Sequence, residues 1–547
     1  MHRALAATAF AVVLVMVPST ASAAGFSYGV SSAEVTSSSA LLWSRAPAAG
    51  KTQLVVAQDR KFRNERTTKN VSAAAGNDLT VQARVTKLAP GTKYFYFFIR
   101  GRQRSAVGTF TTAPKPTVAK TIRFAVTGDA DPVRVNGQNY WNKDGSNNWA
   151  TYKAMTKEKN NFNVNLGDTI YSDAETDQGF PLAFSLAQKR DKYKLGLTYP
   201  NFLRLRAAGP VYNQWDDHEF VDDFTRASQG CDVGSVFSPQ YACDSAAIYK
   251  AGVQAFREYM PVTYTAGDGT YRSFKWGKNL EIFILDERSF RSLRASEVKD
   301  NPAAAEPTTH VCENPAGSGQ EDPAPQLPQR IRSLFSVLYA PAGNPARPEC
   351  LAALNDSSRT MLGSKQYSKF TTAIKKSPAK WKVVVNEVPI MEFALNPYDD
   401  WQGYEFEREK LLKFLKANVK NVAFLTTDFH ANWVNDARIK TFPEDGGPID
   451  SGVMEFVAGG VADRTFGKEI DAFTGSADSW KLIDNLYLKK PPPDGPGMLC
   501  SNMVSYGYAQ VEATATKLTV SMKDNKGKPI VDAETSKPCG PYVLSAK

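Results

Sequence analysis

The stretch that decides the fold reads Phe162-Asn163-Val164-Asn165-Leu166-Gly167-Asp168-Thr169-Ile170-Tyr171. Its first five residues predict a short strand that ends at Gly167-Asp168. Residues 122–127 predict an earlier strand, which ends in the same way at Gly128-Asp129, and the apolar residues within 149–159 have helical spacing. Strand, helix and strand in this order predict an α/β core in which sheets and helices form layers.

The same pattern continues toward the C-terminus. Further strands are predicted over 280–285, 381–385, 422–426 and 454–457, and a helix over 411–417. Residues 506–547 contain short strands that should close the sheet. Residues 300–350 are rich in Pro, Gly, Ala and Ser and predict a long surface excursion. We therefore expect one large domain over residues 120–547.

The preceding part of the chain, residues 26–114, has a different pattern. Short strands with partial alternation are predicted over 40–44, 52–57, 79–85 and 94–99. Strands at this spacing predict a small β-sandwich. The run LAPGTKYFYFF over 88–98 resembles the fibronectin type III pattern, and Ala113-Pro114-Lys115-Pro116 indicates a linker to the larger domain.

Residues 1–23 predict a secretory signal peptide. The apolar run from Ala4 to Val17 is too short to span a bilayer, and Ala21-Ser22-Ala23 supplies the small residues of a cleavage site. No later segment approaches about twenty uninterrupted apolar residues, so we expect no transmembrane segment. The protein is therefore expected to be secreted or periplasmic.

Six cysteines fit such an exported chain, because an even number in an oxidising compartment predicts disulfides. Sequence order suggests Cys231–Cys243, Cys312–Cys350 and Cys500–Cys539, although six cysteines allow about fifteen pairings. Buried free thiols are the alternative. A thiolate metal site is disfavoured, since the chain has no Cys-x-x-Cys pair.

The formal charge of +10 suits a nucleic acid, an anionic membrane surface or an anionic substrate. Lys and Arg are scattered along the chain without a basic block, which favours a solvated basic surface and no stable nucleic-acid partner. The sequence leaves the oligomeric state open.

Acidic and histidine-bearing segments follow several of the predicted strands. They read Thr127-Gly128-Asp129-Ala130-Asp131, Gly167-Asp168-Thr169-Ile170-Tyr171, Trp215-Asp216-Asp217-His218-Glu219 and Thr427-Asp428-Phe429-His430. Each segment alone is compatible with a turn, a helix cap or a solvated loop. Ligands of open α/β sheets bind beyond the carboxyl ends of strands, so the conjunction of these segments predicts one shared site.

The residue types in these segments indicate metal chemistry. Carboxylates bind hard cations, and imidazole extends the range to zinc and other transition metals. One aspartate can bridge two ions about 3.5–4 Å apart, and paired ions can hold both oxygens of an in-line phosphoryl displacement. The glycine before Asp168 lets the backbone turn sharply, and Tyr171 can add a phenolate, which favours ferric iron. Of the four histidines, His2 leaves with the signal peptide and His310 lies in the excursion, so His218 and His430 are the informative pair.

These motifs resemble the PhoD-like (alkaline phosphatase D) family of the calcineurin-like metallophosphoesterases. The resemblance covers nearly the whole chain after the signal peptide and includes NNWATYKAM, NLGDTIY, QWDDHEF, ILDERSF, WKVVVNEVPIM and TTDFHANW. It implies a four-layer αββα core with two or three metal ions, preceded by the fibronectin III-like β-sandwich.

The resemblance also implies roles for single residues. Asp168 would bridge the metals. Ferric iron would be bound by Asp129, Tyr171 and His430, and a second ion such as Ca²⁺ by Asp217, Asn386 and Asp428; Zn²⁺, Mn²⁺ and Mg²⁺ are alternatives. His218 would contact the phosphate or protonate the leaving group.

The chain departs from the family pattern at the first metal. Family members often have a cysteine at the end of the first core strand, whereas this chain has no cysteine before Cys231. Asp131 is an alternative ligand there. Arg288, in ILDERSF, is a further candidate that could grip phosphate with two hydrogen bonds, although a structural ion pair is the alternative.

The expected function is hydrolysis of phosphate monoesters, in which a metal-activated hydroxide attacks phosphorus in line. A phosphodiesterase or phospholipase D on the same centre is the nearest alternative. A secreted binding module without catalysis is the alternative from another class, suggested by the β-sandwich and the basic charge.

Overall fold

The apolar runs in the middle of the chain form strands where the sequence predicts them. The computed structural model describes residues 25–63, 67–173, 182–226, 244–300, 309–338 and 340–547. The predicted strands over 122–127, 162–166, 381–385, 422–426 and 454–457 have the same bounds in the structure. The signal peptide predicted for residues 1–23 lies outside the described residues.

The first of two large sheets contains six strands in the order β13-β12-β9-β21-β22-β23. The strands β9, β12 and β13 run parallel, and β21 joins β9 in the antiparallel direction. Their bounds are Ile122–Thr127 (β9), Phe162–Leu166 (β12), Val211–Gln214 (β13), Gly507–Ala513 (β21), Lys517–Asp524 (β22) and Tyr542–Ser545 (β23).

The second large sheet contains seven strands in the order β14-β15-β16-β17-β19-β18-β20. Its central strands β15, β16, β17 and β19 are parallel. The bounds are Arg272–Trp276 (β14), Leu280–Ile284 (β15), Trp381–Val385 (β16), Val422–Thr426 (β17), Asn432–Asp436 (β18), Met454–Val457 (β19) and Cys500–Asn502 (β20).

Alternating side chains of the two sheets meet in one core. Phe124 and Phe162 point into it and stack at 4.7 Å between ring centroids, together with Ile282, Val383 and Leu425 of the other sheet. The intervening residues point outward, as the period of two in a strand requires. This packing of sheet on sheet forms the two inner layers.

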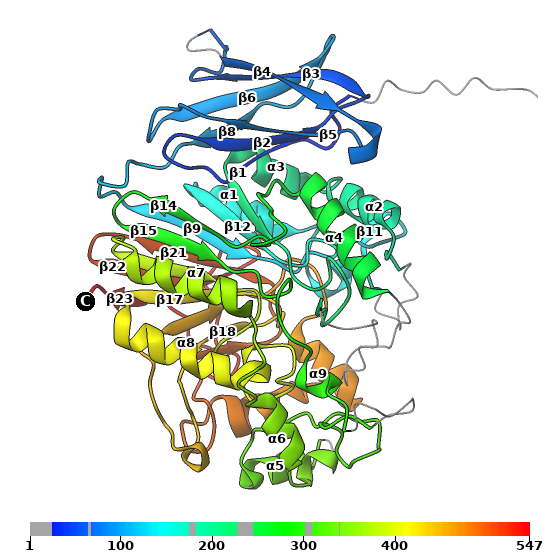
Figure 1. Ribbon diagram of the computed structural model, residues 1–547, viewed down its shortest axis with the longest axis vertical. Coiled ribbons are helices and arrows are strands. Elements are labelled where there is room, and N and C mark those ends of the chain that lie inside the picture. Colours follow the sequence, from blue (N-terminus) through cyan, green and yellow to red (C-terminus); the bar gives the residue numbers. More distant parts are fainter. Residues whose placement is uncertain (1–24, 64–66, 174–181, 227–243, 301–308, 339) are drawn as a thin grey trace, which may run out of the picture.

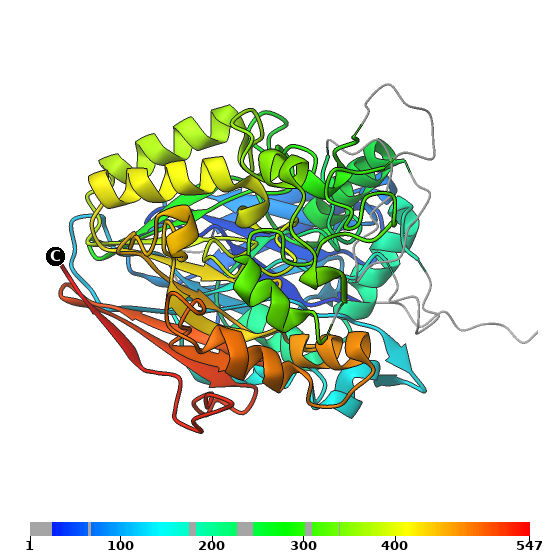
Figure 2. The same cartoon turned by 90° about the horizontal axis from the view of Figure 1, so that it is seen from below.

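Helices cover both outer faces. The first face packs against α1 (Ala150–Lys157), α2 (Leu186–Gly196), α3 (Pro200–Ala208) and α4 (Ser245–Tyr259), and the second against α7 (Gly363–Lys376) and α8 (Glu405–Asn418). Figure 1 shows the layers from the side. In Figure 2, α7 and α8 lie on one side of the molecule and the red C-terminal strands on the other. The predicted four-layer αββα core is confirmed.

The N-terminal strands form two facing sheets. One contains β1 (Val30–Ala33), β2 (Ala40–Arg45) and β5 (Thr80–Val85), and the other β3 (Gly50–Ala57), β4 (Thr67–Ala73), β6 (Lys93–Arg100), β7 (Gln103–Arg104) and β8 (Gly108–Thr111). The sandwich is bonded to the core, since Trp43 Nε1 donates to the Glu258 carbonyl at 2.6 Å and the Tyr212 hydroxyl to the Val35 carbonyl at 2.5 Å.

The predicted surface excursion contains two helices, α5 (Gln329–Phe335) and α6 (Pro348–Leu354), and its described part is held by the disulfide Cys312–Cys350. The disulfide Cys500–Cys539 joins β20 to the C-terminal region. Both predicted pairs are confirmed; the third, Cys231–Cys243, lies outside the described residues. The remaining α-helices and strands of the described ranges are α9 (Phe466–Thr474), α10 (Trp480–Ile483) and the ribbon of β10 (Arg134–Val135) with β11 (Gln138–Asn139). No helix within the described ranges has the length and apolar character of a membrane span.

Candidate metal centre

The loops after β9, β12, β13 and β17 bring the predicted acidic residues together. Three overlapping groups form, and within each group the potential ligand atoms lie within 4.8 Å of one another. The groups are Asp129, Asp168 and His430; Asp168, Asp217 and His218; and Asp216, Asp217 and Asp428. Asp168 belongs to two of them, and this is the arrangement that a bridging carboxylate requires.

Four of the predicted ligands have left-handed backbone conformations. The φ angles are 53° at Asp129, 46° at Asp168, 74° at Asp428 and 48° at His430. Such angles are uncommon for residues other than glycine, and they concentrate at functional sites because the surrounding structure must hold them. The backbone therefore turns four side chains toward one place at a conformational cost.

The glycines before the first two aspartates are required for close packing. A Cβ atom on Gly128 would lie 1.9 Å from the Leu166 carbonyl oxygen, and a Cβ on Gly167 would lie 2.5 Å from the Asp216 Cβ. Because no side chain fits at either position, the loops after β9, β12 and β13 can approach one another directly.

The first group is built to receive a cation. Tyr171 Oη lies 3.0 Å from His430 Nε2, and His430 Nδ1 donates to the Arg464 carbonyl at 2.7 Å. This second bond leaves Nε2 as the nitrogen for a metal. Asp129 is buried and its Oδ2 has no hydrogen-bond partner. Burial raises the pKa of Asp129 to about 7, so its anion lacks stabilisation that a cation would supply.

A buried arginine contacts all three residues of the third group, Asp216, Asp217 and Asp428. Arg288 is fully buried, and its Nε donates to Asp216 while Nη1 lies 2.7 Å from Asp399 Oδ1. Its Nη2 lies 3.5 Å from Asp428 Oδ1 and 3.6 Å from Asp217 Oδ2. All three guanidinium nitrogens thus face carboxylates. The structure thus shows Arg288 in internal ion pairs. Its contact with phosphate stays a prediction.

Asn386 lies at the end of β16, as predicted, and is buried. Its Oδ1 accepts from Trp401 Nε1 at 3.1 Å, and its Nδ2 donates to the Val388 carbonyl. Neither partner belongs to the three acidic groups. Its role as a ligand stays a prediction.

His218 is oriented by a carboxylate that the sequence motifs did not single out. Its Nδ1 lies 2.6 Å from Asp173 Oδ1, and its ring lies 4.2 Å from the Tyr171 ring between centroids. Burial disfavours the imidazolium, but Asp173 and Asp168 outweigh it and raise the pKa of His218 well above its usual value. Asp173 lies only two residues beyond Tyr171, so its position beside the motif was the available signal.

Glu219 and Lys189 fix the loop after β12 relative to the loop after β13. The buried Glu219 carboxylate accepts from the backbone amides of Asp168 at 3.1 Å, Thr169 at 2.8 Å and Asp216 at 2.8 Å. Lys189 Nζ donates to Ser172 Oγ at 2.6 Å and to the Glu219 carbonyl at 2.9 Å. Their function depends on contacts that local sequence does not reveal.

Glu219→Gln is expected to lower the free energy of unfolding by about 1–3 kcal/mol, because an amide group would face backbone donors that then lack an acceptor. Urea denaturation at fixed metal concentration measures this. The control Glu444→Gln changes a glutamate whose side chain is 47% exposed, and should stay within about 0.5 kcal/mol of wild type. Equal stability of Glu219→Gln and the control would contradict the role assigned to Glu219.

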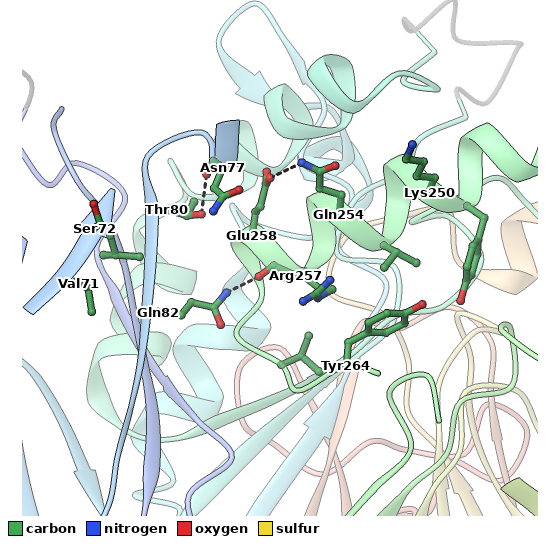
Figure 3. Close-up of a pocket in the computed structure, with 14 residues that line it drawn as sticks. Val71, Ser72, Asn77, Thr80, Gln82, Lys250, Gln254, Arg257, Glu258 and Tyr264 are labelled. Atoms are coloured by element: carbon green, nitrogen blue, oxygen red, sulfur yellow. Dashed lines mark hydrogen bonds between the residues drawn. The ribbon is translucent and has the colours of Figure 1, made fainter. Parts of the chain in front are cut away.

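A cavity of about 750 Å³ lies elsewhere, between the sandwich and α4. Its lining includes Gln82, Lys250, Gln254, Arg257 and Tyr264 (Figure 3). None of the predicted ligands lines it. The candidate centre is therefore the group of loops at the strand ends and not this cavity.

Comparison with known proteins agrees with the geometry. The family model described as PhoD-like phosphatase matches residues 133–522, and the model of the N-terminal domain of PhoD-like phosphatases matches residues 11–114. Alkaline phosphatase D of Bacillus subtilis (strain 168) is 24% identical over 456 residues, which cover 76% of this chain and 66% of that protein. The chain thus matches just under two thirds of that relative's length.

Two solved structures share the fold. A structure of PhoD superposes with a TM-score of 0.67 at 20% identity and covers 96% of this chain and 90% of the other. Purple acid phosphatase PPD1 from yellow lupin (Lupinus luteus) seeds gives a TM-score of 0.53 at 11% identity, covering 92% of this chain and 73% of the other. These two matches show the fold, and the family model over residues 133–522 shows that the chain belongs to the PhoD-like phosphatase family.

Proposed function

We propose that the chain is a metal-dependent phosphoesterase that hydrolyses phosphate monoesters. The observation that carries this proposal is the sharing of Asp168 between two groups of potential ligands, one of which includes the buried, unpaired Asp129 Oδ2. Family membership and the name of the Bacillus subtilis relative, alkaline phosphatase D, support the same reaction.

The residues fit two unlike cations. Asp129, Tyr171 and His430 combine carboxylate, phenolate and imidazole donors, which suit Fe³⁺, with Zn²⁺ or Mn²⁺ as alternatives. Asp217 and Asp428, with Asn386 as a further candidate, offer oxygen donors that suit Ca²⁺ or Mg²⁺. When bound, such cations neutralise phosphate oxygens and lower the pKa of water.

Residues of the chain would position the cations and donate the proton. Asp168 would hold the two cation sites at a fixed separation. His218, whose pKa is raised by Asp173 and Asp168, would donate a proton to the leaving-group oxygen or a hydrogen bond to the phosphate. Asp173 fixes the ring through Nδ1, so Nε2, which lies 3.5 Å from Asp222 Oδ1, is the nitrogen that would face the substrate. No serine or cysteine of these motifs is needed as nucleophile, because attack by water is direct.

A side-by-side assay of p-nitrophenyl phosphate, bis-p-nitrophenyl phosphate and phosphatidylcholine tests the substrate class. Preference for the monoester is the expected result. Preference for either diester would replace the proposal with a phosphodiesterase or phospholipase D on the same centre. Absence of turnover on all three, in protein that also lacks iron, zinc and calcium, would favour a secreted binding module.

Export from the cytoplasm is part of the proposal. The disulfides Cys312–Cys350 and Cys500–Cys539 fit a secreted or periplasmic protein, as does the predicted signal peptide. Detection of the mature chain in the medium or periplasm by mass spectrometry, with an N-terminus near residue 24, checks this.

A further inference from the structure

A third carboxylate, Asp463, lies beside His430 in addition to Asp129 and Asp168, although no sequence motif pointed to it. The loop that follows β19 runs parallel to the loop that follows β9, with a β-bridge between Ala130 and Ala462. The Asp131 amide donates to the Ala462 carbonyl at 2.7 Å, and the Ala462 amide donates to the Asp129 carbonyl at 2.9 Å. These bonds fix the position of the next residue, Asp463, next to the first group of ligands.

Gly460 permits this approach. A Cβ atom on Gly460 would lie 3.0 Å from Asp129 Cβ and 3.3 Å from Asp129 Oδ2. A larger residue would therefore push the two loops apart or displace the Asp129 carboxylate. The glycine keeps the Asp129 side chain and the loop carrying Asp463 in direct contact.

The Asp463 side chain points at the same place as the predicted ligands. It is 2% exposed, and its Oδ1 accepts from the Arg464 amide at 2.6 Å. Its Oδ2 lies 3.7 Å from His430 Nε2, the nitrogen left for a metal. One oxygen is thus held by the backbone and the other faces the His430 imidazole.

Asp131, the alternative ligand predicted from the sequence, is engaged elsewhere. Its Oδ1 accepts from the Val133 amide at 3.0 Å, and its Oδ2 accepts from Trp141 Nε1 at 2.8 Å. Both oxygens therefore have partners outside the group formed by Asp129, Tyr171 and His430, whereas Asp129 Oδ2 has none.

We propose that Asp463 is a ligand of the cation that Asp129, Tyr171 and His430 face, in a chain that has no cysteine before Cys231. The donor set is then three carboxylates counting Asp168, one phenolate and one imidazole. Hard oxygen donors of this kind favour ferric iron over softer ions. The inference rests on the proposed function, because it concerns the metal of the same centre.

The test compares purified wild type with Asp463→Asn and the matched variant Asp131→Asn. Metal per chain is measured by mass spectrometry after dialysis against a weak chelator, and the visible absorption of an iron(III)–phenolate pair is recorded. Loss of even an outer partner of a ligand costs about 10- to 100-fold in metal affinity, so Asp463→Asn should lose iron by at least that factor. Asp131→Asn should keep iron and the wild-type absorption maximum.

Wild-type iron content and absorption in Asp463→Asn would overturn the inference, as would equal loss in both variants. Circular dichroism reports whether Asp463→Asn folds. If it does not, Asp463→Glu decides, since it keeps a carboxylate: retained iron with a shifted absorption supports ligation, and an unshifted absorption contradicts it. Absence of bound metal from wild type itself would instead overturn the proposed function.

Discussion

Asp168→Asn is expected to lower kcat for p-nitrophenyl phosphate by about 10²- to 10⁴-fold, because loss of a bridging carboxylate removes several kcal/mol of charge stabilisation. Asp168 is the residue shared by two groups of potential ligands. The variant should stay folded, since asparagine is among the residues that tolerate the φ of 46° found there.

Asp478→Asn is the matched control for that variant. Asp478 has a φ of 63° and a side chain that is 64% exposed. The Asp478→Asn variant makes the same chemical change at a residue with a similar backbone conformation but outside the candidate centre. It should retain wild-type kcat. Steady-state kinetics and thermal melting of both variants measure the difference. Wild-type turnover by folded Asp168→Asn would remove the basis of the proposed function.

His218→Ala is expected to lower kcat by about 10²- to 10⁴-fold, the usual range for loss of a general acid. The ring is held by Asp173 at 2.6 Å, and the side chain is 17% exposed, so it can reach a bound ester. The substitution should lower kcat more for esters whose leaving group needs protonation than for p-nitrophenyl phosphate, whose p-nitrophenolate does not. Alkyl phosphates and p-nitrophenyl phosphate, assayed with both enzymes, measure this dependence.

His310→Ala is the control for the loss of a histidine, because His310 lies in the excursion with a side chain that is 35% exposed. It should be indistinguishable from wild type. An equal fall in kcat for good and poor leaving groups would assign His218 to stabilisation of the phosphate and not to proton donation. An unchanged kcat in His218→Ala would contradict both roles.

The central strands could be predicted from sequence because most are short, largely apolar runs, and several are followed at once by Gly-Asp or a polar residue. The helix α8 starts six residues before its predicted start, at Glu405, because its first turn is acidic and is favoured by the helix dipole instead of by apolar spacing. The antiparallel insertion of β21 beside β9 joins segments that are far apart in the chain, and no local pattern indicates it.

The candidate centre could be predicted to the extent that its residues follow strands. Asp129, Asp168, Asp217 and Asp428 stand at strand ends, and the shared edge of the sheets brings them together. Asp463 follows β19 only after a loop whose path depends on the β-bridge to Ala130. The ion pairs of Arg288 likewise join four separate segments, so they require the folded structure.

The most direct test of a metal-dependent phosphoesterase is the turnover of p-nitrophenyl phosphate by one preparation before chelation, after chelation, and after reloading with iron and calcium. The predicted result is loss of activity on chelation, with the circular dichroism spectrum retained, and recovery on reloading. The contradicting result is undiminished turnover after chelation, in protein shown by elemental analysis to contain no metal.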